Sequence, residues 1–245
     1  CYATGSVTGT YGVGGLVGWN SRGTLTACYA TSSVTGTVWY VGGLVGMNHG
    51  SLTDCYATGS VIGDSEVGGL VGRNNQGKVI RCYSTGKPTG TPNVGGLCGY
   101  KITGGGYEDT GNFWDTETSE IDTSLMGTGK TTEQMQTLST FTDAGWDFSA
   151  IDGDQADWWI KANSYPRLEM WYSGGDGSAE NPHKIANVPD WQELMATPGD
   201  WNSCFLLTAD VNLAGIDLTP VGNVGTQFTG VFDGNDNIIS NAVIN

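Results

Sequence analysis

The stretch Cys1-Tyr2-Ala3-Thr4-Gly5-Ser6-Val7 indicates the fold, because similar stretches recur three more times along the chain. It returns at Cys28-Tyr29-Ala30-Thr31, at Cys55-Tyr56-Ala57-Thr58 and, with one change, at Cys82-Tyr83-Ser84-Thr85. The cysteines stand at positions 1, 28, 55 and 82, so the period is 27 residues without slippage. A fixed period of this length indicates a solenoid, in which each repeat forms one rung of a continuous stack.

Each repeat also contains a glycine-rich phrase, Val-Gly-Gly-Leu-Val-Gly. The phrase begins at Val13, Val41 and Val67, and a fourth copy begins at Val94 with Cys98 in place of the second valine. The spacings between copies are 28, 26 and 27 residues, so one extra residue is offset by one fewer in the next rung. This compensation predicts that every rung closes a turn of fixed length.

Three short runs of strand-forming residues fill each repeat, and glycines separate them. In the first copy the runs are Cys1 to Val7, Tyr11 to Val17 and Thr24 to Ala27. Threonine, valine and tyrosine favour pleated strands, and glycine favours the corners between strands. The sequence therefore predicts an all-β fold, a β-solenoid (β-helix) of three-strand rungs stacked about 4.8 Å apart, with short helices only in the flanking segments.

Stacking places equivalent side chains above one another in ladders. The predicted ladders are Cys1, Cys28, Cys55 and Cys82; Tyr2, Tyr29, Tyr56 and Tyr83; and Asn20, Asn48 and Asn74. Alternation along a strand puts the cysteines inside, on one face with the alanines two residues on and with Val7, Val34, Val61 and Pro88. The asparagines are expected at a corner, where side-chain amides bond along the stack.

The tyrosine ladder points outward in this interpretation. Exposed tyrosines can stack on sugars or pack against another protein segment. The alternative is that the rest of the chain covers them, because large exposed apolar patches are rare on monomers.

Composition limits the classes of function. The net charge of −15 opposes nucleic acid as a partner. No apolar run approaches the roughly 20 residues of a membrane span. The chain begins in mid-repeat, so the missing signal segment says nothing about its compartment. The cysteines are interpreted as small buried hydrophobes rather than as disulfides, and the sequence has no C-x-x-C pair for zinc.

These phrases together carry a family resemblance. Residues 1–100, with V-G-G-L-V-G-x-N and C-Y-A-T-G-x-V in four copies, resemble the GLUG repeat of secreted or surface-attached bacterial and archaeal proteins. The relatives include filamentous-haemagglutinin-like adhesins and non-catalytic regions of immunoglobulin-cleaving peptidases. The resemblance implies a β-helical module at the cell surface or outside the cell, and it brings no catalytic residues. The fourth rung departs from the pattern, with Lys101 at the asparagine position and two prolines, Pro88 and Pro92, which cannot donate to a strand ladder. We therefore expect the regular stack, residues 1–109, to end with this rung.

A tryptophan-rich segment, residues 110–172, follows the rungs. Its aromatic residues need a surface to bury them, so we expect a cap or clasp on the end or flank of the solenoid. The phrase Gly127-Thr128-Gly129-Lys130-Thr131-Thr132 is an incomplete phosphate-binding loop, and Thr131 with Gln134 is better interpreted as the capping box of a helix through about Leu138.

Acidic residues crowd two loops of this segment, and calcium is the one cofactor to consider. Asp152, Asp154 and Asp157 are weak calcium candidates, because the glutamate of the 12-residue calcium loop is missing; a second cluster is Asp115, Glu117, Glu120 and Asp122. The preferred interpretation is a solvated acidic loop and no cofactor.

The last segment, residues 173–245, contains a flexible linker, a short helix from Pro189 to about Thr197 and strands near Cys204–Leu213 and Phe228–Asn235. It resembles the module that leads into the rungs of such β-helical proteins. Phe228, Phe232, Ile239 and Val243 are expected to line an open strand edge. The first rung at Cys1 would have a second open edge, so the chain is expected to be one period of a head-to-tail array of copies, covalent or non-covalent.

The sequence offers no catalytic constellation. The acids of the rungs, Asp54, Asp64 and Glu66, do not recur at rung spacing, and His49 and His183 have no visible partners. We therefore expect a non-enzymatic extracellular structural protein, a unit of a filament or surface fibre. The alternatives are an adhesin module that binds glycans or neighbouring surfaces and, less favoured, a β-helical polysaccharide-degrading enzyme.

Overall fold

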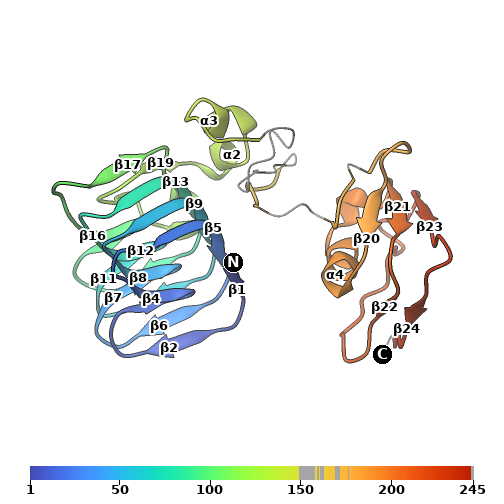
Figure 1. The fold of residues 1–245 in the computed structure, drawn as a ribbon, viewed down its shortest axis with the longest axis horizontal. Helices are drawn as coiled ribbons and strands as arrows, with labels where there is room; N and C mark the ends of the chain where they lie inside the picture. The colour runs from blue at the N-terminus through green and yellow to red at the C-terminus, as the bar shows by residue number, and fades with distance from the viewer. Residues whose placement is uncertain (149–157, 159, 161–162, 169–171, 176, 244–245) are drawn as a thin grey trace. The chain divides into compact units, whose positions relative to one another are not determined.

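The computed structural model describes residues 1–245 except 149–157, 159, 161–162, 169–171, 176 and 244–245. The chain forms two compact units, Cys1–Leu168 and Glu169–Asn245, and each is described by itself. In Figure 1 the first unit runs from blue to yellow and the second from orange to red.

Parallel sheets run along the stack of the first unit, and every rung adds one strand to each (Figure 1). The first sheet holds β1 (Tyr2–Ala3), β5 (Thr24–Ala30), β9 (Ser51–Ala57), β13 (Lys78–Ser84), β18 (Phe113–Asp115) and β19 (Thr128–Lys130), with β17 (Glu108–Thr110) also on β13. The second holds β2 (Val7–Gly9), β6 (Val34–Gly36), β10 (Val61–Ile62) and β14 (Pro88–Thr89). The third holds β3 (Val13–Gly14), β7 (Trp39–Gly42), β11 (Ser65–Gly68) and β15 (Val94–Gly95). The fourth holds β4 (Val17–Asn20), β8 (Val45–Asn48), β12 (Val71–Asn75) and β16 (Cys98–Ile102). All pairs are parallel, and the repeat positions align, as in Tyr2 with Tyr29 and Cys28 with Cys55.

The β-solenoid prediction is confirmed, but each rung has four strands where three were predicted. The difference lies mainly in the glycine phrase, which bends at Gly15-Leu16 and so forms two strands, in different sheets, instead of one. A Cβ atom on Gly14 would lie 2.2 Å from the Val17 carbonyl oxygen. The third and fourth sheets approach too closely there for any side chain, which is why the phrase needs glycine.

Two core clusters run through the stack. The cysteine and alanine ladders face Leu44, Leu70 and Leu97 and their neighbours in one cluster. The ladder of Val34 and Val61 lies on the second sheet and packs against the valines that open each glycine phrase in another cluster. The prediction that the cysteine, alanine and valine ladders share one strand face was therefore wrong, because a corner after Ala30 turns the chain onto a new sheet.

The first sheet continues past the fourth rung, where the regular stack was expected to end. Phe113 and Trp114 pair in register with Tyr83 and Ser84. Trp114 thereby occupies the alanine position of the ladder and packs at the end of the core cluster. One bulky indole in place of a methyl group closes the core at this end.

Short helices follow: α1 (Thr116–Ser119), α2 (Thr132–Met135) and α3 (Leu138–Thr142). The predicted capping box is present, since Thr131 accepts from the Gln134 backbone N–H while the Gln134 side chain accepts from the Thr131 N–H. The helix ends earlier than expected, at Met135, and a second helix begins at Leu138. Gly127-Thr128-Gly129-Lys130 does not form a phosphate-binding loop, because Thr128–Lys130 is strand β19.

The second unit is a smaller parallel arrangement. It contains β20 (His183–Ile185), α4 (Val188–Ala196), a 3-10 turn (Pro198–Asp200), β21 (Cys204–Leu207), β22 (Val211–Asn212), β23 (Val231–Asp233) and β24 (Ile239–Ser240). The strands pair in the orders β20-β21-β23 and β22-β24. Across the structurally described part of the chain, no helix has the length and apolar character that a membrane crossing requires.

Candidate interaction surfaces

The asparagine ladder lies at the corner between the fourth and first sheets. The Asn20 side-chain amide donates to Asn48 Oδ1 at 2.9 Å, and the Asn48 amide donates to Asn74 Oδ1 at 2.8 Å. Each amide also bonds to a glycine of its own corner, such as Gly23 or Gly50. The ladder stops at the fourth rung, where Lys101 pairs with Asn74. This corner is a structural feature of the stack.

The tyrosine ladder is the surface on which the clasp docks; we use clasp for the described residues of 131–168. The rings of Tyr2, Tyr29, Tyr56 and Tyr83 stack with centroids 4.8–5.1 Å apart. The clasp covers three of them, chiefly with Trp146 and Trp158, whereas Tyr2 is 56% exposed. Tyr83 Oη donates to the Pro166 carbonyl at 2.6 Å. Of the two interpretations of the ladder, coverage by the chain itself holds for Tyr29 to Tyr83.

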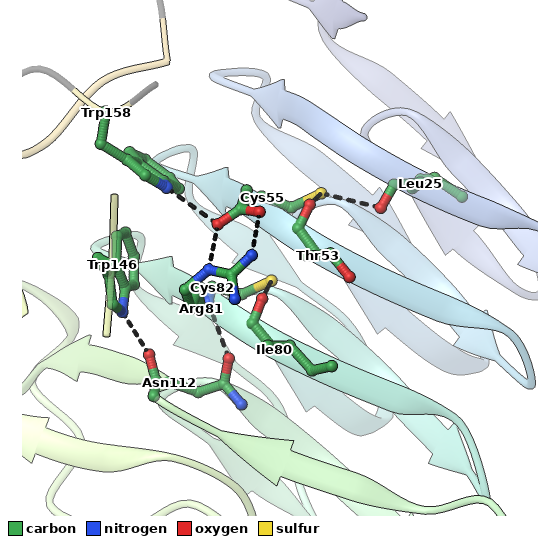
Figure 2. Close-up of polar contacts among 11 residues, drawn as sticks. Leu25, Thr53, Cys55, Ile80, Arg81, Cys82, Asn112, Trp146 and Trp158 are labelled. Carbon is green, nitrogen blue, oxygen red and sulfur yellow. Dashed lines mark hydrogen bonds and ion pairs between the residues drawn. The ribbon is translucent and has the colours of Figure 1, made fainter. Parts of the chain in front are cut away.

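An ion pair with a buried carboxylate, that of Asp54, fixes the clasp to the stack (Figure 2). Arg81 binds both carboxylate oxygens of Asp54, at 2.7 and 2.6 Å, and Trp158 Nε1 donates to the same carboxylate at 3.1 Å. The Arg81 pKa is raised by its hydrogen bonds to Asp54. Figure 2 also shows Trp146, whose indole N–H donates to the Gly111 carbonyl at 2.8 Å. These contacts were not predicted from the sequence.

The cysteines are free thiols. Cys28, Cys55 and Cys82 are buried, and each thiol donates to the carbonyl two residues before it at 3.2 Å. Burial raises the pKa of Cys55 well above its usual value and that of Cys98 to about 12. Buried thiols with raised pKa values are poor nucleophiles, so these side chains fill the core. Cys1 differs, because its side chain is exposed.

The acidic candidates divide into two groups. The predicted calcium candidates Asp152, Asp154 and Asp157 lie outside the described residues. In the second cluster Asp115 is fully buried and accepts from the backbone of Glu117 and Thr118, from Thr132 Oγ1 and from Tyr165 Oη. It caps α1 and holds the clasp. Within the described ranges no three His, Cys, Asp or Glu side chains are grouped to hold a metal ion.

Three of the four residues predicted to line the assembly edge, Phe228, Phe232 and Ile239, pack against the core of the second unit. The rings of Phe228 and Phe232 lie 5.9 and 6.2 Å from that of Phe205, and Ile239 packs on the same cluster. Val243 is 61% exposed. Strands β23 and β24 each end their sheet, so one side of each has no strand partner among the described residues.

Exposed aromatic side chains on the first two rungs were not singled out from the sequence. Tyr11, Trp39 and Tyr40 contact one another, and the Arg73 guanidinium lies 5.1 Å from the Tyr40 ring centroid. Trp19 stacks on His49 with centroids 5.9 Å apart. These positions do not repeat from rung to rung, so periodicity cannot reveal them.

Comparison with known proteins agrees with this geometry. The GLUG motif matches residues 9–35, 37–62 and 63–89, three consecutive rungs of the stack. The chain contains three GLUG repeats. Each copy of the GLUG motif begins where the second strand of a rung ends, so the three copies contain the cysteine phrases at Cys28, Cys55 and Cys82, and the phrase at Cys1 precedes the first copy. No curated protein matches the sequence.

The GLUG-repeat chain is also similar to one solved structure, described as a "putative immunoglobulin A1 protease" from Bacteroides ovatus. The TM-score is 0.50 at 20% sequence identity, over 69% of this chain and 56% of that one. The chain therefore matches little more than half of that protein's length. At this identity the similarity concerns the fold alone, a β-helix.

Proposed function

We propose that this GLUG-repeat chain is a non-catalytic structural element of an extracellular or surface fibre, in which copies join head to tail. GLUG repeats and a β-helical neighbour point to a surface or extracellular repeat protein. The filament is the more specific part of the proposal, and one observation supports it: both units stack parallel strands, and strands β21 and β23 of the second unit are spaced like the rungs of the first.

One strand pair of the second unit has the rung spacing of the first. In the first unit Tyr2 pairs with Tyr29 and Val7 with Val34, each 27 positions on. In the second unit Cys204 pairs with Val231, again 27 positions on, and Val211 with Ile239, 28 positions on, whereas His183 pairs with Phe205 after only 22. Parallel strands of similar spacing can continue one ladder across a junction, and among the described residues the outer sides of β1 to β4 and of β23 and β24 have no strand partner.

Charge supports the same pairing. Residues 1–101 hold six lysines and arginines against three acids, whereas residues 169–245 hold ten acids and one lysine. Four of the six rung cations pair with carboxylates of the same unit, whereas Arg22 on the first rung has no such partner among the described residues. Arg22 would attract the acidic second unit of a neighbouring copy in a head-to-tail contact, and two acidic second units would repel each other in a tail-to-tail contact. The charge distribution therefore favours one direction of assembly.

Electron microscopy of the purified chain tests the proposal. The intact mass of the protein distinguishes covalent from non-covalent joining, since a mass far above 25.7 kDa would indicate a covalent tandem array. Fibres with a regular axial repeat are expected at low salt, and they should shorten as salt screens the charges. Separate particles at every concentration and salt would contradict the filament. A depolymerisation assay on acidic polysaccharides tests the non-catalytic part, since release of unsaturated sugars would show an enzyme.

The second candidate is an adhesin module, favoured by the exposed aromatic side chains of the first two rungs. Tyr11, Trp19 and Trp39 are 46–56% exposed, and aromatic rings with a nearby arginine are enriched where proteins bind partners. Adhesion and fibre formation use different surfaces of the stack, its flank and its ends.

A further inference from the structure

A hollow of about 410 Å³ opens on the flank of the solenoid, just outside the asparagine ladder. Three successive rungs contribute to it, because the corner residues that follow β4, β8 and β12 line it. These are chiefly Ser21, Arg22, His49, Asn75, Gln76 and Lys78. We call this feature the corner hollow. Its size lies in the range of small-ligand sites.

The corner hollow concentrates positive charge in an acidic protein. Arg22 is exposed and makes no hydrogen bond or ion pair with any described residue. Lys78 lies 3.2 Å from Glu108, but both side chains are more than 40% exposed, so this pair is weak. The uncommitted guanidinium of Arg22 is a ready partner for an anionic group.

One residue that lines the corner hollow, His49, belongs to an aromatic pair. Trp19 is 56% exposed, and its ring stacks nearly parallel to that of His49, at 6° with the centroids 5.9 Å apart. The His49 Nε2 atom is buried without a hydrogen-bond partner. The other lining groups are amides and hydroxyls, from Asn75, Gln76, Ser21 and Ser51.

We propose that the corner hollow binds an acidic saccharide, a sugar that carries a carboxylate. A sugar ring presents a flat C–H face for the Trp19 indole and hydroxyls for Asn75 and Gln76. Its carboxylate would pair with Arg22. A neutral sugar leaves the guanidinium unused, and a simple anion leaves the indole and the amides unused. An acidic saccharide uses all three groups.

The test is an NMR titration of the full chain with methyl glucuronide and with methyl glucoside, which differ only in the carboxylate. Comparison with the Trp19→Ala variant assigns the Trp19 indole N–H signal. We expect this signal to shift with the glucuronide and binding of the glucoside to be at least about tenfold weaker, the effect of one charge-assisted hydrogen bond. Arg22→Gln should abolish the difference between the two sugars.

Trp39→Ala is the matched control, because Trp39 is a similarly exposed tryptophan of the first two rungs whose ring contacts Tyr11 and Tyr40, neither of which lines the hollow. It should bind the glucuronide as the parent chain does. Equal affinity for the two sugars, an equal shift with inorganic sulfate or with an acidic peptide, or no shift at all would each overturn the proposal. The fibre assay has a different readout, so either proposal can fail alone.

Discussion

At the scale of single residues, the asparagine ladder predicts that equivalent positions in different rungs contribute unequally to stability. Asn48 is fully buried and bonds to the asparagines of both neighbouring rungs. Asn48→Ala removes both bonds and leaves Asn74 Oδ1 buried without its partner. We expect the free energy of unfolding to fall by about 3 kcal/mol, as buried polar groups that lose partners are costly. Urea unfolding followed by far-UV circular dichroism measures it.

Asn20→Ala is the matched comparison, because Asn20 ends the ladder. The Asn48 carbonyl oxygen would keep the Gly50 N–H as a donor, at 3.2 Å. The loss should therefore be nearer to about 1 kcal/mol. Equal losses for the two variants would mean that the ladder does not act as a chain of bonds.

The same scale separates what periodicity reveals from what it hides. The ladders of Cys28, Tyr29 and Asn48 could be read from the sequence because each residue type recurs at one rung position. Asp54 and Arg81 also occupy one rung position, with Ala27 below them, and all three have positive φ angles, from 49° to 52°. The residue type at this position differs from rung to rung, so the repeat pattern does not predict the ion pair between Asp54 and Arg81.

At the scale of elements, the glycine phrase predicts a sharp steric limit. A Cβ atom on Gly42 would lie 2.1 Å from the Val45 carbonyl oxygen and 2.6 Å from the Gly72 backbone nitrogen. Backbone atoms of two rungs cannot move aside together. Gly42→Ala should cost about 3 kcal/mol or prevent folding.

Gly5→Ala provides the control, since nothing lies within 4 Å of a Cβ built there. It should change the thermal midpoint little. A Gly42→Ala variant as stable as Gly5→Ala would contradict the close approach of the third and fourth sheets.

The clasp should respond to alkaline pH before the stack does. Burial and then the hydrogen bond to Asp115 raise the pKa of Tyr165 to about 12, and burial raises the pKa of Tyr83 well above its usual value. A folded pKa above the ordinary value of about 10 means that the unfolded chain loses the proton first. The stability that neutral Tyr165 contributes is thus complete below about pH 10 and declines as pH rises toward about 12.

Tryptophan fluorescence and tyrosinate absorbance across this pH range follow the release of Trp146 and Trp158. Tyr165→Phe removes the ionising group, so its fluorescence should change less steeply with pH, although the clasp is weaker at neutral pH. A pH profile identical to that of the parent chain would show that Tyr165 does not control the clasp.

At the scale of the whole molecule, the 27-residue repeat was enough to predict the solenoid and its strand register, and local helix propensity was enough to predict short helices. The tryptophan-rich segment was expected to bury its rings on the stack, but its target, the tyrosine ladder, depends on how the chain turns after Asp115. That turn rests on a buried carboxylate with four hydrogen-bond donors from three segments. Long-range contacts of this kind have no period and no local signature.

The head-to-tail fibre makes the last prediction, at the open side of β2. The Val7 N–H donates to the Ser33 carbonyl and the Gly9 carbonyl accepts from the Thr37 N–H, so both residues face β6. Thr8, between them, is exposed and directs its backbone N–H to the open side. Thr8→Pro removes this donor without removing a bond inside the chain, because edge strands tolerate proline. Fibres should be lost while the unfolding midpoint stays near that of the parent, whereas Thr8→Val, which keeps the N–H, should form fibres normally. Fibres of unchanged length from Thr8→Pro would show that the first rung is not the joining edge.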